Sequence, residues 1–128
     1  MAKAYQPYRT SEDLVLRVLR KLGVLASGQT VAPEDFSLVA DELDSIFRTL
    51  AGLELVYVAD PTQLPGEWFG DLASIVAGEL AADFGASDAT TLKQLGLGVP
   101  AGSGAAALSL KVMTRGRPTY ETMRTESF

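Results

Sequence analysis

Residues 66–85, GEWFGDLASIVAGELAADFG, carry the pattern that decides the fold. Large apolar side chains recur there every three or four positions, which is the spacing of one face of an α-helix. They are Trp68, Phe69, Leu72, Ile75, Val76, Leu80 and Phe84. The pattern predicts a helix over residues 67–84. Gly85 is expected to close it, because glycine readily adopts the left-handed conformation that ends a helix.

Small residues mark the same predicted helix. Ala73, Ala77 and Ala81 recur at every fourth position, and only a narrow polar edge of Asp71, Glu79 and Asp83 remains. Side chains this small allow a neighbouring helix to approach closely. We therefore expect this to be the central helix, contacted on more than one side.

Two amphipathic helices are predicted before it. Thr10 followed by Asp13 is a capping arrangement, and the apolar stripe that follows ends before Gly23. Pro33 suits the first position of a second helix, over residues 33–52, whose apolar residues again fall three or four apart. Each helix has one apolar face that must pack on another element.

The remaining segments are shorter. Residues 53–58, LELVYV, favour β-structure and predict a small strand or an extended connector. Ser87 is a candidate cap for a fourth helix through Leu95. Residues 96–104, GLGVPAGSG, predict a flexible loop, and residues 105–113 a fifth short helix.

These patterns predict a mainly α protein in two parts. Residues 1–113 form a small helical bundle of four to five helices, with a short extended connector after the second helix. Residues 114–128 form an extended C-terminal arm, because Gly116 and Pro118 both oppose helix formation. Fully stretched, this arm reaches about 50 Å.

The arm is expected to dock on a partner. It keeps Tyr120, Met123 and Phe128, which gain most when they are removed from water, whereas disordered chain ends are usually poor in such residues. The alternative is an ordinary frayed terminus. If the arm docks, the candidate contact residues are Arg115, Arg117, Tyr120, Arg124 and Phe128.

Composition and charge narrow the classes of function. The chain has 128 residues, 47% of them hydrophobic, without an apolar run long enough for a membrane span, so we expect one soluble domain made in a cytoplasm. Residues 31–90 hold twelve Asp and Glu against Arg48 alone, whereas the arm is basic. An acidic body repels phosphate backbones, which argues against DNA binding by the body.

Sequence signals for catalysis are weak. The chain has no His and no Cys, which removes imidazole bases, thiolate nucleophiles and the common zinc sites. Glu79 and Asp83 share a helix face, but no companion cluster accompanies them. The glycines of residues 96–104 have no preceding strand and no following Gly-Lys-Ser/Thr, so they do not predict nucleotide binding. We therefore expect a protein that is not an enzyme and uses no cofactor or metal.

The stretch DLVLRVLRKLGVLASGQTVAPEDFSLVADELDSIFRTL, the DPTQLPGEW turn, the alanine-rich helix ending AADFG and the terminal arm together resemble a known family. They are similar to the head-to-tail adaptor proteins of tailed bacteriophages, and within them to the tail accessory, or packaged-DNA stabilisation, proteins of short-tailed phages. The likeness spans most of the chain and rests on helices and turns.

The resemblance implies a virion protein of the head-to-tail connector, made in the host cytoplasm. Its subunits would form a ring under the portal protein, twelvefold by likeness to the family, close the DNA-filled head and present a docking surface to a downstream tail protein. DNA would pass without specific binding, and the arm would lie along the portal.

Two other classes of function stay open from the sequence. One is a small helical regulatory or adaptor domain that binds a partner protein through the C-terminal tail. The other is an unrecognised hydrolase, which needs a pocket that unites two carboxylates or a Ser-Lys pair.

Overall fold

A computed structural model describes residues 8–26 and 28–114 as a bundle that is mainly helical. Within these residues five helices and two very short strands occur, and no strand follows α2 directly. The predicted fold class is therefore confirmed. Residues 53–58 form a turn and a connector rather than a strand, and two buried side chains, Leu55 and Val56, attach this connector to the core.

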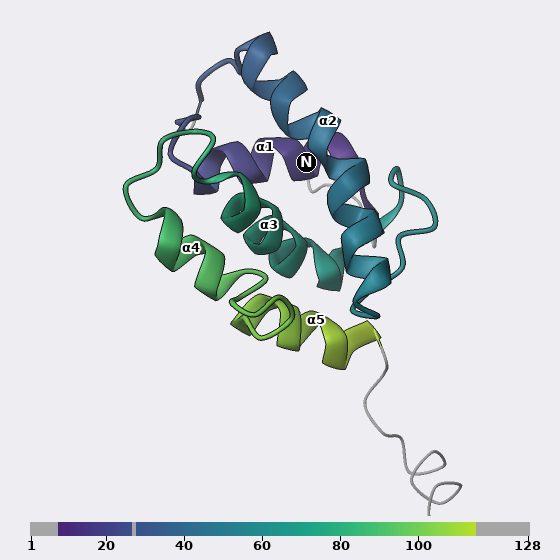
Figure 1. Cartoon of the computed structure of the whole chain (residues 1–128). Helices are drawn as coiled ribbons and strands as arrows, with labels where there is room; N and C mark the ends of the chain where they lie inside the picture. The colour runs from purple at the N-terminus through teal and green to yellow at the C-terminus, as the bar shows by residue number, and fades with distance from the viewer. Residues whose placement is uncertain (1–7, 27, 115–128) are drawn as a thin grey trace, which may run out of the picture.

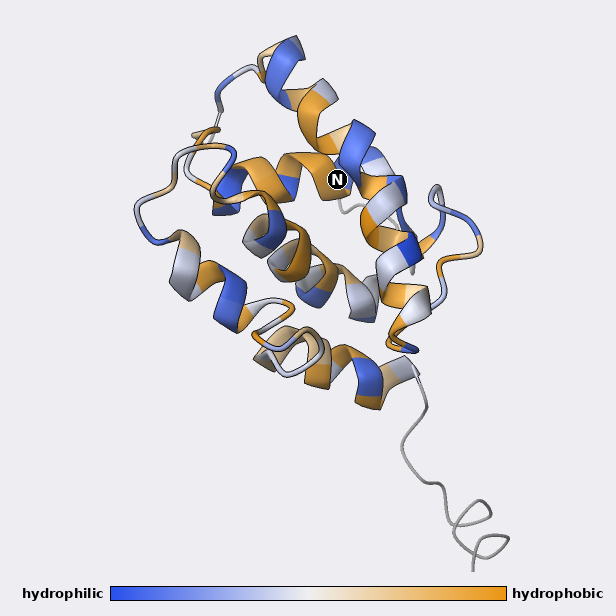
Figure 2. Cartoon of the chain, viewed as in Figure 1, coloured by the Kyte–Doolittle hydropathy of each residue, from blue (hydrophilic) through white to orange (hydrophobic). Residues whose placement is uncertain are grey.

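The predicted central helix, α3 (Gly66–Leu80), lies in the middle of the bundle (Figure 1). Three helices pack against it: α1 (Ser11–Lys21), α4 (Ala89–Leu95) and α5 (Ala105–Thr114). The longest helix, α2 (Pro33–Gly52), packs mainly on α1. Blue and orange alternate along the ribbon of α2, as is typical of an amphipathic helix (Figure 2). The central position predicted for α3 is confirmed.

Helix α1 begins with the predicted capping box. The backbone N–H of Asp13 donates to the hydroxyl of Thr10, and the backbone N–H of Thr10 donates to the carboxylate of Asp13, both at 3.2 Å. Two otherwise unpaired donors at the start of the helix are thereby satisfied. Gly23 (φ +76°) ends the same helix in the left-handed conformation, as expected.

The ends of two other helices differ from the prediction. Regular helix in α3 stops at Leu80, four residues earlier than expected, although the chain continues in turns to Gly85. Gly85 (φ +69°) still closes the segment, because the N–H of Ala86 donates to the carbonyl of Ala81. Ser87 was the wrong cap: the N-cap of α4 is Asp88, and its side chain makes no capping hydrogen bond.

A two-residue antiparallel pairing joins the start of the chain to the start of α3. Strand β1 (Tyr8–Arg9) pairs with β2 (Leu64–Pro65), with Arg9 opposite Leu64. The guanidinium of Arg9 also lies 4.4 Å from the ring centre of Phe69, in cation–π geometry. This pairing was absent from the prediction, because it joins segments that are far apart in sequence.

The glycine-rich segment 96–104 is packed rather than flexible, so that part of the prediction was wrong. A Cβ on Gly96 would lie 2.6 Å from the carbonyl oxygen of Ser74, so this loop runs directly against α3. The N–H groups of Gly102 and Gly104 both donate to the carbonyl of Leu97, which is buried. The glycines here serve close backbone approach, not mobility.

Candidate functional site

The residues predicted to contact a partner all lie outside the described residues. They are Arg115, Arg117, Tyr120, Arg124 and Phe128. The structure does describe the helix that precedes them. Helix α5 ends at Thr114, one residue later than the predicted helix over residues 105–113.

The end of α5 is fixed to the connector that follows α2. The hydroxyl of Thr114 donates to the backbone carbonyl of Leu55 at 2.7 Å, and Leu55 is buried. Met113, the preceding residue, is partly buried against the hydrophobic core. A shallow cavity of about 260 Å³ opens beside this contact, between Thr114 and Tyr57. The last residue of α5 is therefore held by a tertiary contact.

Exposed apolar side chains gather around α5. Within the described part of the chain, eight large hydrophobic side chains are exposed, and six of them lie on α5 or on the segments at its two ends. We name these six the α5 surface: Leu53, Tyr57, Leu95, Val99, Leu108 and Val112. Leu108 and Val112 are 51% and 57% exposed, and their spacing of four places them on one face of the helix.

Backbone hydrogen bonds hold the flanking segments of the α5 surface in place. At the N-terminal end of α5, the N–H of Ala107 donates to the carbonyl of Gly96, which brings the chain between Leu95 and Val99 against the helix. At the other end, the bond from Thr114 to Leu55 holds the segment that contains Leu53 and Tyr57. The segments that carry the α5 surface are therefore hydrogen-bonded to α5 at both of its ends.

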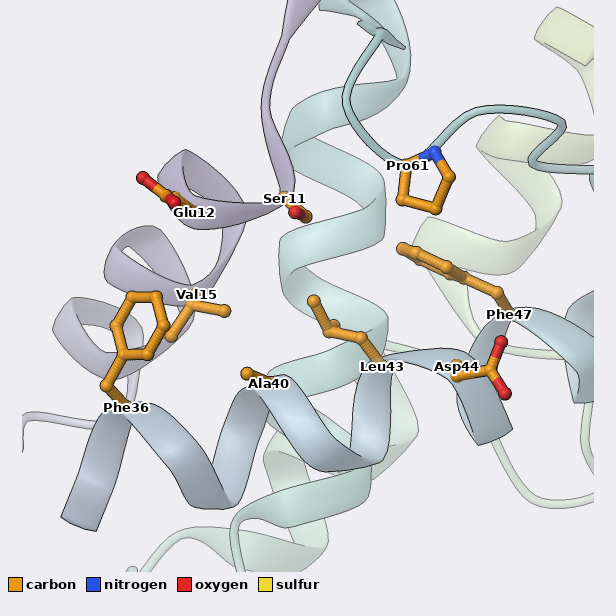
Figure 3. Close-up of a pocket in the computed structure, with 9 residues that line it drawn as sticks. All are labelled: Ser11, Glu12, Val15, Phe36, Ala40, Leu43, Asp44, Phe47 and Pro61. Atoms are coloured by element: carbon orange, nitrogen blue, oxygen red, sulfur yellow. The ribbon is translucent and has the colours of Figure 1, made fainter. Parts of the chain in front are cut away.

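A second feature is a groove between the start of α1, the middle of α2 and the loop that follows α2 (Figure 3). Its volume is about 350 Å³. We name it the α1–α2 groove; its apolar lining consists of Val15, Phe36, Ala40, Leu43, Phe47 and Pro61. Two carboxylates, Glu12 and Asp44, lie on opposite sides of this lining (Figure 3). The groove thus combines an apolar floor with an acidic rim.

The loop wall of the groove is held by a small hydrogen-bonded turn. Thr62 donates to Asp60 Oδ1 with both its hydroxyl, at 2.6 Å, and its backbone N–H, at 2.9 Å. These two bonds favour the carboxylate and lower the pKa of Asp60 below its usual value. Pro61 lies inside this turn, so its position on the groove wall follows from the Asp60–Thr62 contact.

Of the two carboxylates that share a helix face in the sequence, Glu79 and Asp83, Glu79 makes an ion pair between helices. Glu79 on α3 faces Lys93 on α4, with 3.3 Å between the ammonium nitrogen and a carboxylate oxygen. The side chains of both residues are only partly exposed, so the ion pair contributes to the contact between the two helices. Within residues 8–26 and 28–114, no group of three or more Asp and Glu side chains is arranged to hold a metal ion.

The side chains of the core are uniformly apolar. No polar or charged side chain is buried anywhere in the described part of the chain. No helix there has the length and apolar character needed to cross a membrane.

No protein-family model, curated protein or solved structure matches this chain. Its two candidate interaction sites, the α5 surface and the α1–α2 groove, were missed at sequence level because each is assembled from separate segments.

Proposed function

We propose that this protein is a structural subunit of a phage head-to-tail connector. In this role it forms a ring under the portal protein, closes the DNA-filled head and provides the docking surface for tail components. The observation that carries the proposal is the α5 surface beside the base of the arm. Six large apolar side chains exposed to water cost free energy, and contact with another subunit removes that cost.

A ring needs a subunit whose two contacting faces differ. Head-to-tail contacts of this kind close into a ring when the rotation between neighbours divides a full turn. The α5 surface supplies one of these faces. The segment that follows α5 in the sequence supplies a separate, linked contact to the portal. Two linked contacts bind more tightly than either alone, because the second one becomes intramolecular.

The acidic charge of the body fits a channel that DNA passes through without binding. Glu34, Asp41 and Glu42 are exposed on α2, and the single base of this helix, Arg48, is already paired with Asp44 at 3.1 Å. A surface of this sign repels the phosphate backbone. The proposed role is mechanical and involves no reaction and no cofactor; its place is the virion, after synthesis in the host cytoplasm.

The test is the mass of the complex with the portal protein of the same virus, by native mass spectrometry. We compare the full chain, a version ending at Thr114, and the double variant Leu108→Asp/Val112→Asp. The full chain should join the portal as a closed ring, in about twelve copies if the resemblance to the phage adaptor family extends to ring size. The version ending at Thr114 should bind more weakly, and the double variant should not form the ring.

The matched control is Leu38→Asp, which places the same charge at an exposed leucine of α2 outside the α5 surface. It should assemble normally. If the full chain remains monomeric in the presence of the portal, the connector proposal is wrong, and a helical regulatory or adaptor domain becomes the better account.

A further inference from the structure

The α1–α2 groove and the arm have complementary chemistry. The groove offers an apolar floor between two carboxylates, Glu12 and Asp44. The arm offers an aromatic residue, Tyr120, between two arginines, Arg117 and Arg124. An apolar group flanked by charges of one sign matches an apolar recess flanked by charges of the other sign.

We propose that in the free subunit the arm folds back and seats Tyr120 in the α1–α2 groove of its own body. Arg117 then lies beside Asp44, and Arg124 lies beside Glu12. The ion pair between Asp44 and Arg48 does not prevent this, because both side chains are well exposed and such a pair within a helix contributes only about 0.3–0.5 kcal/mol.

The arm is long enough and starts in the right place. The arm follows Thr114, which lines the same cavity as Ala51 at the end of α2. Leu43, on the groove floor, lies eight residues before Ala51 in that helix. At 1.5 Å per residue the distance along α2 from Ala51 to Leu43 is about 12 Å. Six extended residues from Thr114 to Tyr120 span about 20 Å. The order along the arm, with Arg117 reaching Asp44 before Arg124 reaches Glu12, follows the direction of the groove.

Effective concentration favours the subunit's own arm over that of a second copy. A short flexible tether presents its segment at millimolar effective concentration. At a micromolar concentration of protein, the effective concentration of a subunit's own arm at its groove is therefore about a thousand times that of the arms of other copies. The fold-back contact itself requires no portal. Its consequence rests on the proposed function: the arm is withheld from other contacts until the portal displaces it from the groove.

The test uses the isolated full chain. Because the sequence contains no cysteine, Ser127→Cys gives a single attachment site for a nitroxide spin label. The chain is also labelled with nitrogen-15, and its amide signals are recorded with the nitroxide oxidised and again after it is reduced. With the oxidised label, the signals of Glu12, Ala40 and Leu43 should be less than half as intense as with the reduced label. The loss should be independent of dilution. The loss should be absent in a mixed sample in which one chain carries nitrogen-15 but no spin label and the other carries the spin label but no nitrogen-15.

Variants decide whether the groove itself is responsible. Tyr120→Ser and the double variant Glu12→Gln/Asp44→Asn should each restore most of the lost signal. The control Asp41→Asn/Glu42→Gln removes the same charge from α2 outside the groove lining and should leave the signal loss unchanged.

Three results would overturn the fold-back contact: no signal loss in the labelled chain, loss that occurs in the mixed sample, or loss that neither groove variant reduces. The second of these assigns the groove to a second copy. Since no portal is present, failure here leaves the mass measurement on the portal complex unaffected.

Discussion

Thr10 and Asp13 show how two side chains start a helix on which a candidate site depends. Their reciprocal hydrogen bonds fix the first turn of α1, which also supplies Glu12 to the α1–α2 groove. We expect Thr10→Ala to lower the free energy of unfolding by about 1 kcal/mol, as loss of a helix cap does. Urea unfolding at neutral pH measures this. Thr30→Ala, in the exposed loop before α2, is the control, and equal losses in both variants would contradict the capping argument.

The same turn makes stability depend on acid. Burial alone raises the pKa of Asp13, but the hydrogen bonds from Thr10 and the nearby charge of Arg9 outweigh it and leave this pKa below 3.8. A carboxyl group whose pKa is lower in the folded than in the unfolded protein stabilises the fold at pH values above the unfolded-state pKa. This stabilisation is lost as the pH falls through the folded-state pKa. We therefore expect a loss of stability that begins below about pH 4 and is smaller in Asp13→Asn. Unfolding midpoints of the original protein and of Asp13→Asn, measured from neutral to acidic pH, test this. The same loss of stability with acid in both proteins would contradict the prediction.

The contact between α3 and α4 depends on a glycine. A Cβ on Gly78 would lie 2.6 Å from the carbonyl oxygen of Leu92 and 3.0 Å from Cα of Lys93, both backbone atoms that cannot rotate away. We expect Gly78→Ala to destabilise the protein by about 1–3 kcal/mol. Gly70→Ala is the matched control in the same helix, where nothing lies within 4 Å. It should stabilise by about 0.5–1 kcal/mol. Chemical denaturation of both variants measures these changes. If Gly70→Ala destabilised the protein and Gly78→Ala did not, the packing argument would be wrong.

Within α5, burial separates the residues that hold the fold from those that face outward. Leu110 is fully buried, whereas Leu108 is half exposed on the α5 surface. Leu110→Ala should cost about 2–5 kcal/mol of stability, because it leaves a cavity in the core. Leu108→Ala should change stability by less than about 0.5 kcal/mol. Thermal and urea unfolding measure both values. A large loss from Leu108→Ala would mean that this face already packs within the subunit.

The elements that the sequence predicted correctly have local signals. Pro33 marks the start of α2, and the alanine spacing marks α3, so both follow from a few adjacent residues. The β1–β2 pairing and the packing of segment 96–104 were missed because they depend on contacts between distant segments. The candidate sites follow the same rule. Phe36 and Leu43 were recognised as the apolar face of α2, but which part of that face remains open depends on where Pro61 lies.

The charge of the whole subunit sets how it should associate. The chain carries a net charge of −5, so identical copies repel each other when they associate. Because the α5 surface is apolar, we expect self-association to increase when NaCl is raised from about 0.05 to 0.5 M, which screens that repulsion. Light scattering at fixed protein concentration measures this, with Leu108→Asp/Val112→Asp as the control that should stay monomeric. Association that falls with salt would indicate that ion pairs, not the α5 surface, join the subunits.

The bond from Thr114 to Leu55 also determines where a mechanical load enters the molecule. Any tension along the arm reaches the body at the last turn of α5, and this bond passes part of it to the connector that follows α2. A pull at the end of a helix peels it one turn at a time, whereas a pull shared by two elements must shear both together. The Thr114 hydroxyl therefore helps the last turn of α5 to resist such a pull together with the connector, in addition to the packing of the helix on the core.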